Sequence, residues 1–215
     1  MVASAGSAPS SGERPPLEVT STEAHDVAAR HLAQVAATVL RVPLEPLSQA
    51  IDLLLATRAA GRRVWVFGNG GSAAIASHLV CDLTKTAARP GEVPLRACAL
   101  TDNVPLLTAW ANDAAYERVY AAQIEMLVDP GDVVIAISSS GRSRNIVAAV
   151  RSARTQDARV IGLVGFDGGP TLELADVAIH VPVDDYGVVE DVHAAVCHAL
   201  AAALRASPGE ARSEP

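Results

Sequence analysis

At the centre of the sequence stand Val64-Trp65-Val66-Phe67 and, directly after them, Gly68-Asn69-Gly70-Gly71-Ser72. Four consecutive apolar residues predict a short strand that is covered on both faces, as in a parallel sheet. The glycines predict a tight turn, and an Ala-rich helical segment follows at 74–83. A strand, a turn and a helix in this order form the unit from which α/β folds are built.

The same unit recurs along the chain. Further apolar runs predict strands at 95–100, 133–137, 160–164 and 177–181, and they alternate with helical segments at 116–127, 145–153 and 189–204. Two helices precede the sheet: Thr20 and Glu23 have the spacing of a capping box at the start of the first, and the second spans 44–59. The sequence therefore predicts a doubly wound parallel five-stranded sheet of the flavodoxin-like type, with ligand sites at the carboxyl ends of its strands.

The length and composition indicate a single domain. The chain has 215 residues, of which half are apolar but only 3% are aromatic, so we expect a core of Ala, Val, Leu and Ile. Residues 1–19 and 206–215 are rich in small and polar residues and predict tails, which leaves the domain at 20–205.

The charge and the cysteines exclude several classes of protein. A net charge of −7 argues against a nucleic-acid-binding surface. Three widely separated cysteines, Cys81, Cys98 and Cys197, do not resemble a secreted disulfide framework. The N-terminus lacks the pattern of a signal peptide, and we find no run of about 18 uncharged apolar residues. These features predict a cytoplasmic protein without a membrane partner.

Two loops have the composition of an anion site. The glycine loop, residues 68–72, places exposed amides and the Ser72 hydroxyl at a helix N-terminus. It lacks the spacing of a Walker loop or a dinucleotide fingerprint, and on its own it is also compatible with a simple strand-to-helix turn. The serine loop, Ser138-Ser139-Ser140-Gly141-Arg142-Ser143, follows the third strand and offers four hydroxyls. Serine is a common capping residue, but four together beside the glycine loop favour a phosphate cradle.

Two pairs of titratable residues lie on predicted helices. His78 and Asp82 are four residues apart and share one face, and Glu190 and His198 are eight apart on a mostly apolar helix. A lone histidine in such a helix is more often a hydrogen-bonded core residue. Paired acids and imidazoles in an apolar setting must bond to each other, bind a metal or face a cleft.

Five motifs together resemble the phosphoheptose isomerases of the SIS-domain family. They appear in the family's order over about residues 25–205: the glycine loop, Thr101-Asp102-Asn103, Asn112-Asp113, the serine loop and Gly165-Phe166-Asp167-Gly168-Gly169. The resemblance implies that the phosphate of a sugar phosphate is bound by Ser138, Ser139, Ser140 and Ser143, helped by Asn69, Gly70, Gly71 and Ser72. It also implies that Asp102 and Glu190 contact the substrate.

The resemblance further implies a metal site and a reaction. His78, Asp82, Glu190 and His198 match positions that bind zinc in the family, and Asp82 and His198 match the groups that handle the transferred proton. The family usually has Glu at position 82, Gln at 190, Asp at 187 and Asn at 142, whereas this chain has Asp82, Glu190, Gly187 and Arg142. His193 is an alternative ligand for which we favour a supporting role, and we interpret Cys81 and Cys197 as packing residues.

The implied reaction is the isomerisation of sedoheptulose 7-phosphate to D-glycero-D-manno-heptose 7-phosphate by a homotetramer whose active sites lie between subunits. The alternative is a non-catalytic adaptor that resembles the DnaA initiator-associating protein. Such adaptors generally lack the acid and the last histidine, and both Asp82 and His198 are present here. A sugar-phosphate-sensing domain is a third possibility, but no DNA-binding module flanks this one. We therefore expect an enzyme.

Overall fold

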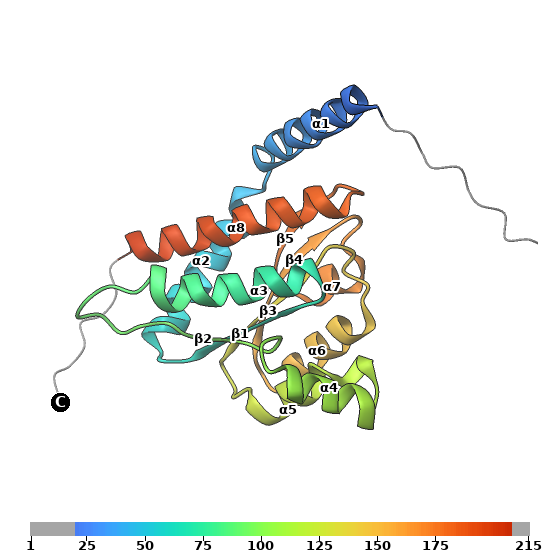
Figure 1. The fold of residues 1–215 in the computed structure, drawn as a ribbon. Coiled ribbons are helices and arrows are strands. Elements are labelled where there is room, and N and C mark those ends of the chain that lie inside the picture. The colour runs from blue at the N-terminus through green and yellow to red at the C-terminus, as the bar shows by residue number, and fades with distance from the viewer. Residues whose placement is uncertain (1–19, 208–215) are drawn as a thin grey trace, which may run out of the picture.

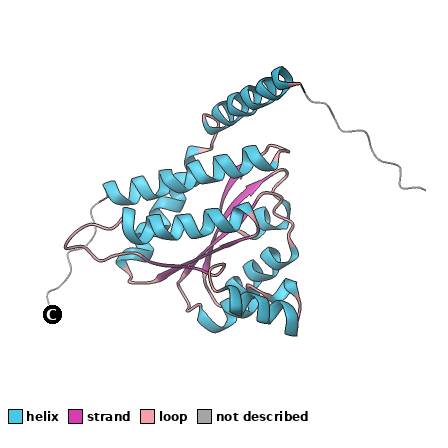
Figure 2. Ribbon diagram, viewed as in Figure 1, coloured by secondary structure: helices cyan, strands magenta, loops and turns pink. Residues whose placement is uncertain are grey.

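The computed structural model describes residues 20–207 and confirms the predicted fold class (Figures 1 and 2). Five strands form one sheet in the order β2-β1-β3-β4-β5, and each neighbouring pair is parallel. This is the strand order of the flavodoxin-like doubly wound fold. The strands are β1 (Arg63–Gly68), β2 (Arg96–Ala99), β3 (Val133–Ser138), β4 (Arg159–Gly165) and β5 (Val177–Val181).

Helices cover both faces of the sheet, as Figure 1 shows. One face packs against α2 (Leu44–Ala59), α3 (Gly71–Cys81) and α8 (Tyr186–Ala206). The other face packs against α4 (Val104–Asp113), α5 (Ala121–Leu127), α6 (Arg144–Thr155) and α7 (Gly169–Leu174). Successive residues of β1 enter opposite cores, with Val64 in the first and Trp65 in the second, because side chains alternate along a strand. A continuous apolar run was therefore the correct signal for a strand buried on both sides.

Three local features differ from the predicted elements. The segment 116–127 is not one helix: a short 3-10 turn, η2 (Tyr116–Arg118), precedes α5, and between them the Tyr120 hydroxyl donates to the Gly68 carbonyl at 2.5 Å. Helices α4 and α7 were not predicted, and both contain a proline in their first turn. The helix α3 continues into a π-helical turn, η1 (Asp82–Thr86), which no periodicity signal revealed.

The first helix, α1 (Ser21–Val39), stands apart from the sheet (Figure 1). Its predicted capping box is confirmed, since the Glu23 amide donates to Thr20 Oγ1 at 3.3 Å and the Thr20 amide donates to Glu23 Oε2 at 3.0 Å. None of its residues is buried. It contacts α8, where His31 Nε2 lies 2.9 Å from Asp191 Oδ2. Within the part of the chain that the structure describes, Val27 and Leu32 of this helix are 55% and 69% exposed, whereas Val35 packs partly against the core cluster at α8.

Helix α8 is, among the described residues, the one helix long and apolar enough to cross a membrane by length and composition alone. Half of the qualifying stretch is buried inside the fold, against α2, α3 and β4. A core helix of a globular protein has the same character. The predicted tail at 1–19 and nearly all of the one at 206–215 lie outside the described residues.

Candidate functional site

The glycine and serine loops meet at one edge of the sheet. Strand β1 ends beside β3, with Gly68 in register with Ile137, so the loops that follow these two strands are neighbours. The chain continues to β2 on one side of β1 and to β3 on the other, which makes this edge the topological switch point where α/β folds bind ligands. A pocket of about 110 Å³ lies there, and its lining is Asn69, Ser72, Ile137, Ser138, Ser139, Ser140, Ser143, Tyr186 and Glu190.

We call this pocket the serine pocket. The hydroxyl groups of its serines differ in the hydrogen bonds that they form within the chain. Ser138 Oγ accepts a hydrogen bond from the Gly141 amide at 3.1 Å, and Ser140 Oγ accepts one from the Arg142 amide at 3.3 Å. Ser139 Oγ is buried and has no hydrogen-bond partner among the described residues. A buried hydroxyl without a partner is costly, so Ser139 is the group that an incoming phosphate oxygen would satisfy best.

A residue that the sequence did not reveal holds the serine loop in place. Thr171 is fully buried in α7, and both its hydroxyl and its amide donate to the carbonyl oxygen of Gly141, at 2.8 and 3.2 Å. Gly141 has a positive φ of 61°, and a side chain there would collide with the backbone of Gly168. The loop after β4 therefore fixes the shape of the loop after β3.

Glu190 enters the serine pocket from α8. Its carboxylate lies against Gly71, so close that a methyl group at position 71 would collide with it. Glu190 is the one charged residue in the pocket lining. It does not join the other predicted metal ligands in one cluster. The structure thus brings together three of the four residues of the predicted zinc set and places the fourth beside the serines of the serine pocket.

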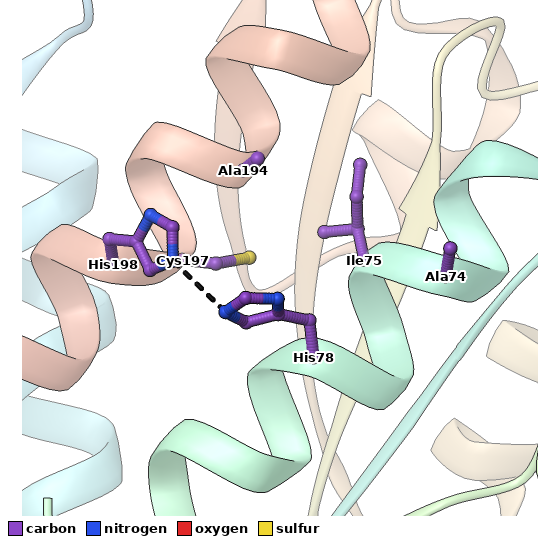
Figure 3. Close-up of a pocket in the computed structure, with 6 residues that line it drawn as sticks. All are labelled: Ala74, Ile75, His78, Ala194, Cys197 and His198. Atoms are coloured by element: carbon purple, nitrogen blue, oxygen red, sulfur yellow. Dashed lines mark hydrogen bonds between the residues drawn. The ribbon is translucent and has the colours of Figure 1, made fainter. Parts of the chain in front are cut away.

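Those three residues converge between α3 and α8, and Figure 3 shows the two histidines of the set. His78 Nε2 lies 3.1 Å from His198 Nε2, and Asp82 Oδ2 lies 3.3 Å from His78 Nε2 and 3.6 Å from His198 Nε2. Asp82 is 8% exposed, and its Oδ1 accepts a hydrogen bond from Thr86 Oγ1 at 2.9 Å, within the π-helical turn. Its Oδ2 is left without a hydrogen-bond donor among residues 20–207.

This cluster fits a divalent metal. One ligand atom from each of its three residues lies within 4.8 Å of the others, and two imidazoles with one carboxylate form a common ligand set of Zn²⁺. The buried, unpartnered Asp82 Oδ2 is a free ligand atom that faces both rings. The distances between these ligand atoms of His78, Asp82 and His198 therefore suit one metal ion.

A second pocket of about 190 Å³ opens beside the two histidines (Figure 3). Its lining is Ala74, Ile75, His78, Ala194, Cys197 and His198. Burial raises the pKa of the Cys197 thiol to about 12, and the charge of Asp82 acts in the same direction. Cys197 therefore stays a neutral thiol, which supports its interpretation as a packing residue.

Asp102 and Arg142 line neither of these two pockets. Asp102, in the loop after β2, accepts hydrogen bonds on Oδ1 from the hydroxyls of Ser77 and Thr101. Ser77 precedes His78, so this loop is tied to the helix that carries the cluster. Arg142 forms an ion pair with Asp167, and that hydrogen bond holds the pKa of the Asp167 carboxyl below its usual value.

Comparison with known proteins assigns the family. Residues 29–165 match the model of the SIS domain. The chain is 42% identical to the phosphoheptose isomerase of Geotalea daltonii over 156 residues, which is 72% of this chain and 80% of that protein. It is 41% identical to the phosphoheptose isomerase of Bordetella avium over 159 residues, which is 73% of this chain and 80% of the relative.

A solved structure agrees with this assignment. The phosphoheptose isomerase GmhA from Neisseria gonorrhoeae superposes with a TM-score of 0.80 at 31% identity and covers 86% of this chain and 100% of its own. The predicted resemblance is therefore confirmed, and the expectation of an enzyme with it. The chain belongs to the SIS-domain family and, within it, to the phosphoheptose isomerases, which are sugar-phosphate isomerases.

Proposed function

We propose that this chain interconverts sedoheptulose 7-phosphate and D-glycero-D-manno-heptose 7-phosphate by proton transfer through an enediol. The observation that carries the proposal is the convergence of the Asp82 carboxylate with the His78 and His198 imidazoles between α3 and α8, the two helices that also supply Ser72 and Glu190 to the serine pocket. The identity of the sugar rests on the similarity to phosphoheptose isomerases.

The serine pocket binds the phosphate in this proposal. Hydroxyls of Ser138, Ser139, Ser140 and Ser143 donate to phosphate oxygens, with Ser72, Asn69 and the amides of Gly70 and Gly71 at the N-terminus of α3. Helix termini and neutral donors stabilise an anion without the need for a lysine. Glu190 is directed to the sugar instead, because its charge disfavours a phosphate next to it.

The proton transfer needs two groups beside adjacent carbon atoms. Asp82 acts as the base that removes the proton from C1 of the ketose, while the C2 carbonyl oxygen is protonated to give the enediol. A proton is then delivered to C2 and the C1 hydroxyl loses its own, which yields the aldehyde. His198 is the acid of this exchange. Its Nε2 faces Asp82 Oδ2 at 3.6 Å, so in the metal-loaded chain only its Nδ1 can carry the proton.

We propose zinc as the metal, held by His78, Asp82 and His198; Glu190, the fourth residue of the predicted set, lies apart from them in the serine pocket. When bound, the metal would supply a Lewis acid that polarises the carbonyl and hydroxyl oxygens. The chain's own residues then need only orient the sugar and move its protons.

We also propose a cytoplasmic homotetramer formed by a single domain at residues 20–205. The observation that supports assembly is the uncovered apolar surface of the N-terminal helices, where Leu32, Leu40 and Leu44 are 69%, 87% and 72% exposed. Apolar side chains in such numbers on one segment are typical of an interface between subunits.

The test is direct. The purified chain, loaded with Zn²⁺, is incubated with a panel of ketose phosphates that differ in length, and aldose formation is followed by NMR. We expect turnover with the seven-carbon substrate and loss of it in the Asp82→Asn variant. A folded, metal-loaded chain that isomerises no member of the panel would refute the proposal and favour the adaptor alternative.

A further inference from the structure

The side chain of Asn69 is held by two residues that the sequence analysis did not single out. Asn69 Oδ1 accepts hydrogen bonds from Asn145 Nδ2 at 2.8 Å and from the Tyr116 hydroxyl at 3.2 Å, while Asn69 Nδ2 donates to Asn145 Oδ1 at 2.9 Å. The two carboxamides thus form a reciprocal pair. It joins the glycine loop after β1 to the start of α6 after β3.

A backbone amide determines which way both carboxamides face. The Ile146 amide, which can only donate, points at Asn145 Oδ1 at 3.0 Å. The oxygen of Asn145 is therefore fixed on that side, and its Nδ2 must face Asn69. Asn69 must in turn present its oxygen to Asn145 Nδ2, which is also the orientation that accepts from the Tyr116 hydroxyl.

These hydrogen bonds leave one N–H group of the Asn69 side chain available to a ligand. Its oxygen already accepts two hydrogen bonds, and one of its two N–H groups donates to Asn145. The second N–H has no partner among residues 20–207, and Asn69 lines the serine pocket. Asn145 is only 3% exposed, so water competes poorly for this arrangement.

We propose that Asn145 and Tyr116 are positioning residues that fix the Asn69 carboxamide so that it offers an N–H donor, and not a carbonyl acceptor, to the phosphate-bearing substrate. The inference rests on the proposed function of the serine pocket. It adds the residues that determine whether Asn69 presents a hydrogen-bond donor or an acceptor to that pocket. A rotated Asn69 would present an oxygen to an anion. The reciprocal pair with Asn145 opposes that rotation, and the Tyr116 hydroxyl adds a second donor to the Asn69 oxygen.

The test measures binding of inorganic phosphate to the full chain by titration calorimetry. Asn145→Ala removes both bonds of the pair, and we expect the dissociation constant to rise about 10-fold, the equivalent of about 1.4 kcal/mol. Tyr116→Phe removes one hydroxyl from an exposed residue, so the variant folds, and we expect a rise of about 3-fold. Gln156→Ala removes an amide at the other end of α6 and should leave the constant unchanged.

A double-mutant cycle separates positioning from general stabilisation. If Asn145 acts through Asn69, adding Asn145→Ala to Asn69→Ala should raise the dissociation constant by less than about 2-fold. Independent, additive losses would overturn the inference, and so would unchanged phosphate affinity in both Asn145→Ala and Tyr116→Phe. An unmutated chain that binds no phosphate would overturn the serine pocket itself and the inference with it.

Discussion

His78 Nε2 and His198 Nε2 lie 3.1 Å apart, although the two residues come from different helices and are separated by 120 positions in the chain. A ring nitrogen offers either an N–H group or a lone pair. Two N–H groups could not face each other at this distance, so at least one of the two Nε2 atoms presents a lone pair. Asp82 Oδ2 lies within 3.6 Å of both. Three groups that converge in this way are arranged to share one cation or one proton.

The first prediction concerns the metal. The unmutated chain should bind one Zn²⁺ per site, and His78→Ala, Asp82→Ala or His198→Ala should each weaken binding by about 10-fold or more, since even residues that only support a metal ligand have effects of that size. Metal content after dialysis and competition with a chromophoric chelator measure this. His25→Ala is the matched control, because it removes an exposed imidazole from α1. Equal zinc content in all four variants would exclude the cluster as the metal site.

The second prediction concerns the proton transfer. Asp82→Asn and His198→Gln should each lower kcat by about 100- to 10,000-fold, because a general acid or base typically contributes that much. The KM for the sugar phosphate should change far less, since the serine pocket is separate from both residues. Steady-state kinetics on metal-loaded protein measure the two constants.

Asp82→Glu is the informative companion to these variants. It keeps the carboxylate and lengthens its reach by one methylene, and it restores the residue that the family usually has. We expect Asp82→Glu to keep measurable turnover and to be clearly faster than Asp82→Asn. Equal activity in Asp82→Asn and the unmutated chain would remove Asp82 from the catalytic assignment.

The third prediction concerns the dependence of stability on pH. His193 is fully buried in α8, and burial lowers its pKa to about 4, with the charge of His180 acting in the same direction and the Val164 backbone opposing it. The unfolded chain takes up a proton near pH 6.5, whereas the folded chain does so only near pH 4. Stability should therefore fall as the pH drops from 6.5 towards 4, by on the order of 2 kcal/mol between pH 7.5 and 5 from this group alone.

Urea unfolding at these two pH values measures the effect. His193→Gln replaces the imidazole with a side chain that does not titrate, so the variant should lose less stability than the unmutated chain between pH 7.5 and 5, whatever its stability at pH 7.5. Parallel pH profiles for the two proteins would show that His193 is not the group responsible.

The sequence predicted the sheet well because its strands are short apolar runs between glycine-rich turns. All five predicted strands are present, and their alternation with helices is what gives the parallel order. Of the two missed helices, α7 has six residues, which are too few to show a helical period. Helix α4 has ten, and its Leu107, Trp110 and Ala111 do recur at helical spacing, so its signal was overlooked. The serine and glycine loops could be placed at one sheet edge from topology alone, because both directly follow strands.

Side-chain partners across the fold could not be predicted in the same way. The i, i+4 spacing brought His78 and Asp82 together, but the meeting of α3 and α8 that adds His198 depends on helix packing. Glu190 shares its helix with His198 yet enters the serine pocket, because eight residues span more than two turns of α8. Thr171 and Asn145 belong to none of the sequence motifs. Each matters because its side chain forms a hydrogen bond with a loop that is distant in the sequence.

The fourth prediction concerns assembly. Leu32→Lys places a charge on the apolar surface of α1, where Leu32 is 69% exposed among residues 20–207. If this surface packs between subunits, the variant should be a smaller species by light scattering and remain folded by circular dichroism. Gln34→Lys adds the same charge on an exposed polar position of the same helix and should keep the assembly of the unmutated chain. Identical masses for both variants would place the interface elsewhere.

The last prediction concerns Ser139, the buried hydroxyl without a partner. Ser139→Ala removes no hydrogen bond from the folded chain, so the free energy of unfolding should stay the same or rise, while phosphate affinity should fall by about 10-fold or more because a donor to a charged group is lost. Ser138→Ala should lower both quantities, since Ser138 Oγ also accepts from the Gly141 amide. Ser48→Ala, on the exposed surface of α2, should change neither. Thermal unfolding without ligand and phosphate titration measure the two effects separately, and a Ser139→Ala chain that binds phosphate as tightly as the unmutated one would show that the hydroxyl does not face the ligand.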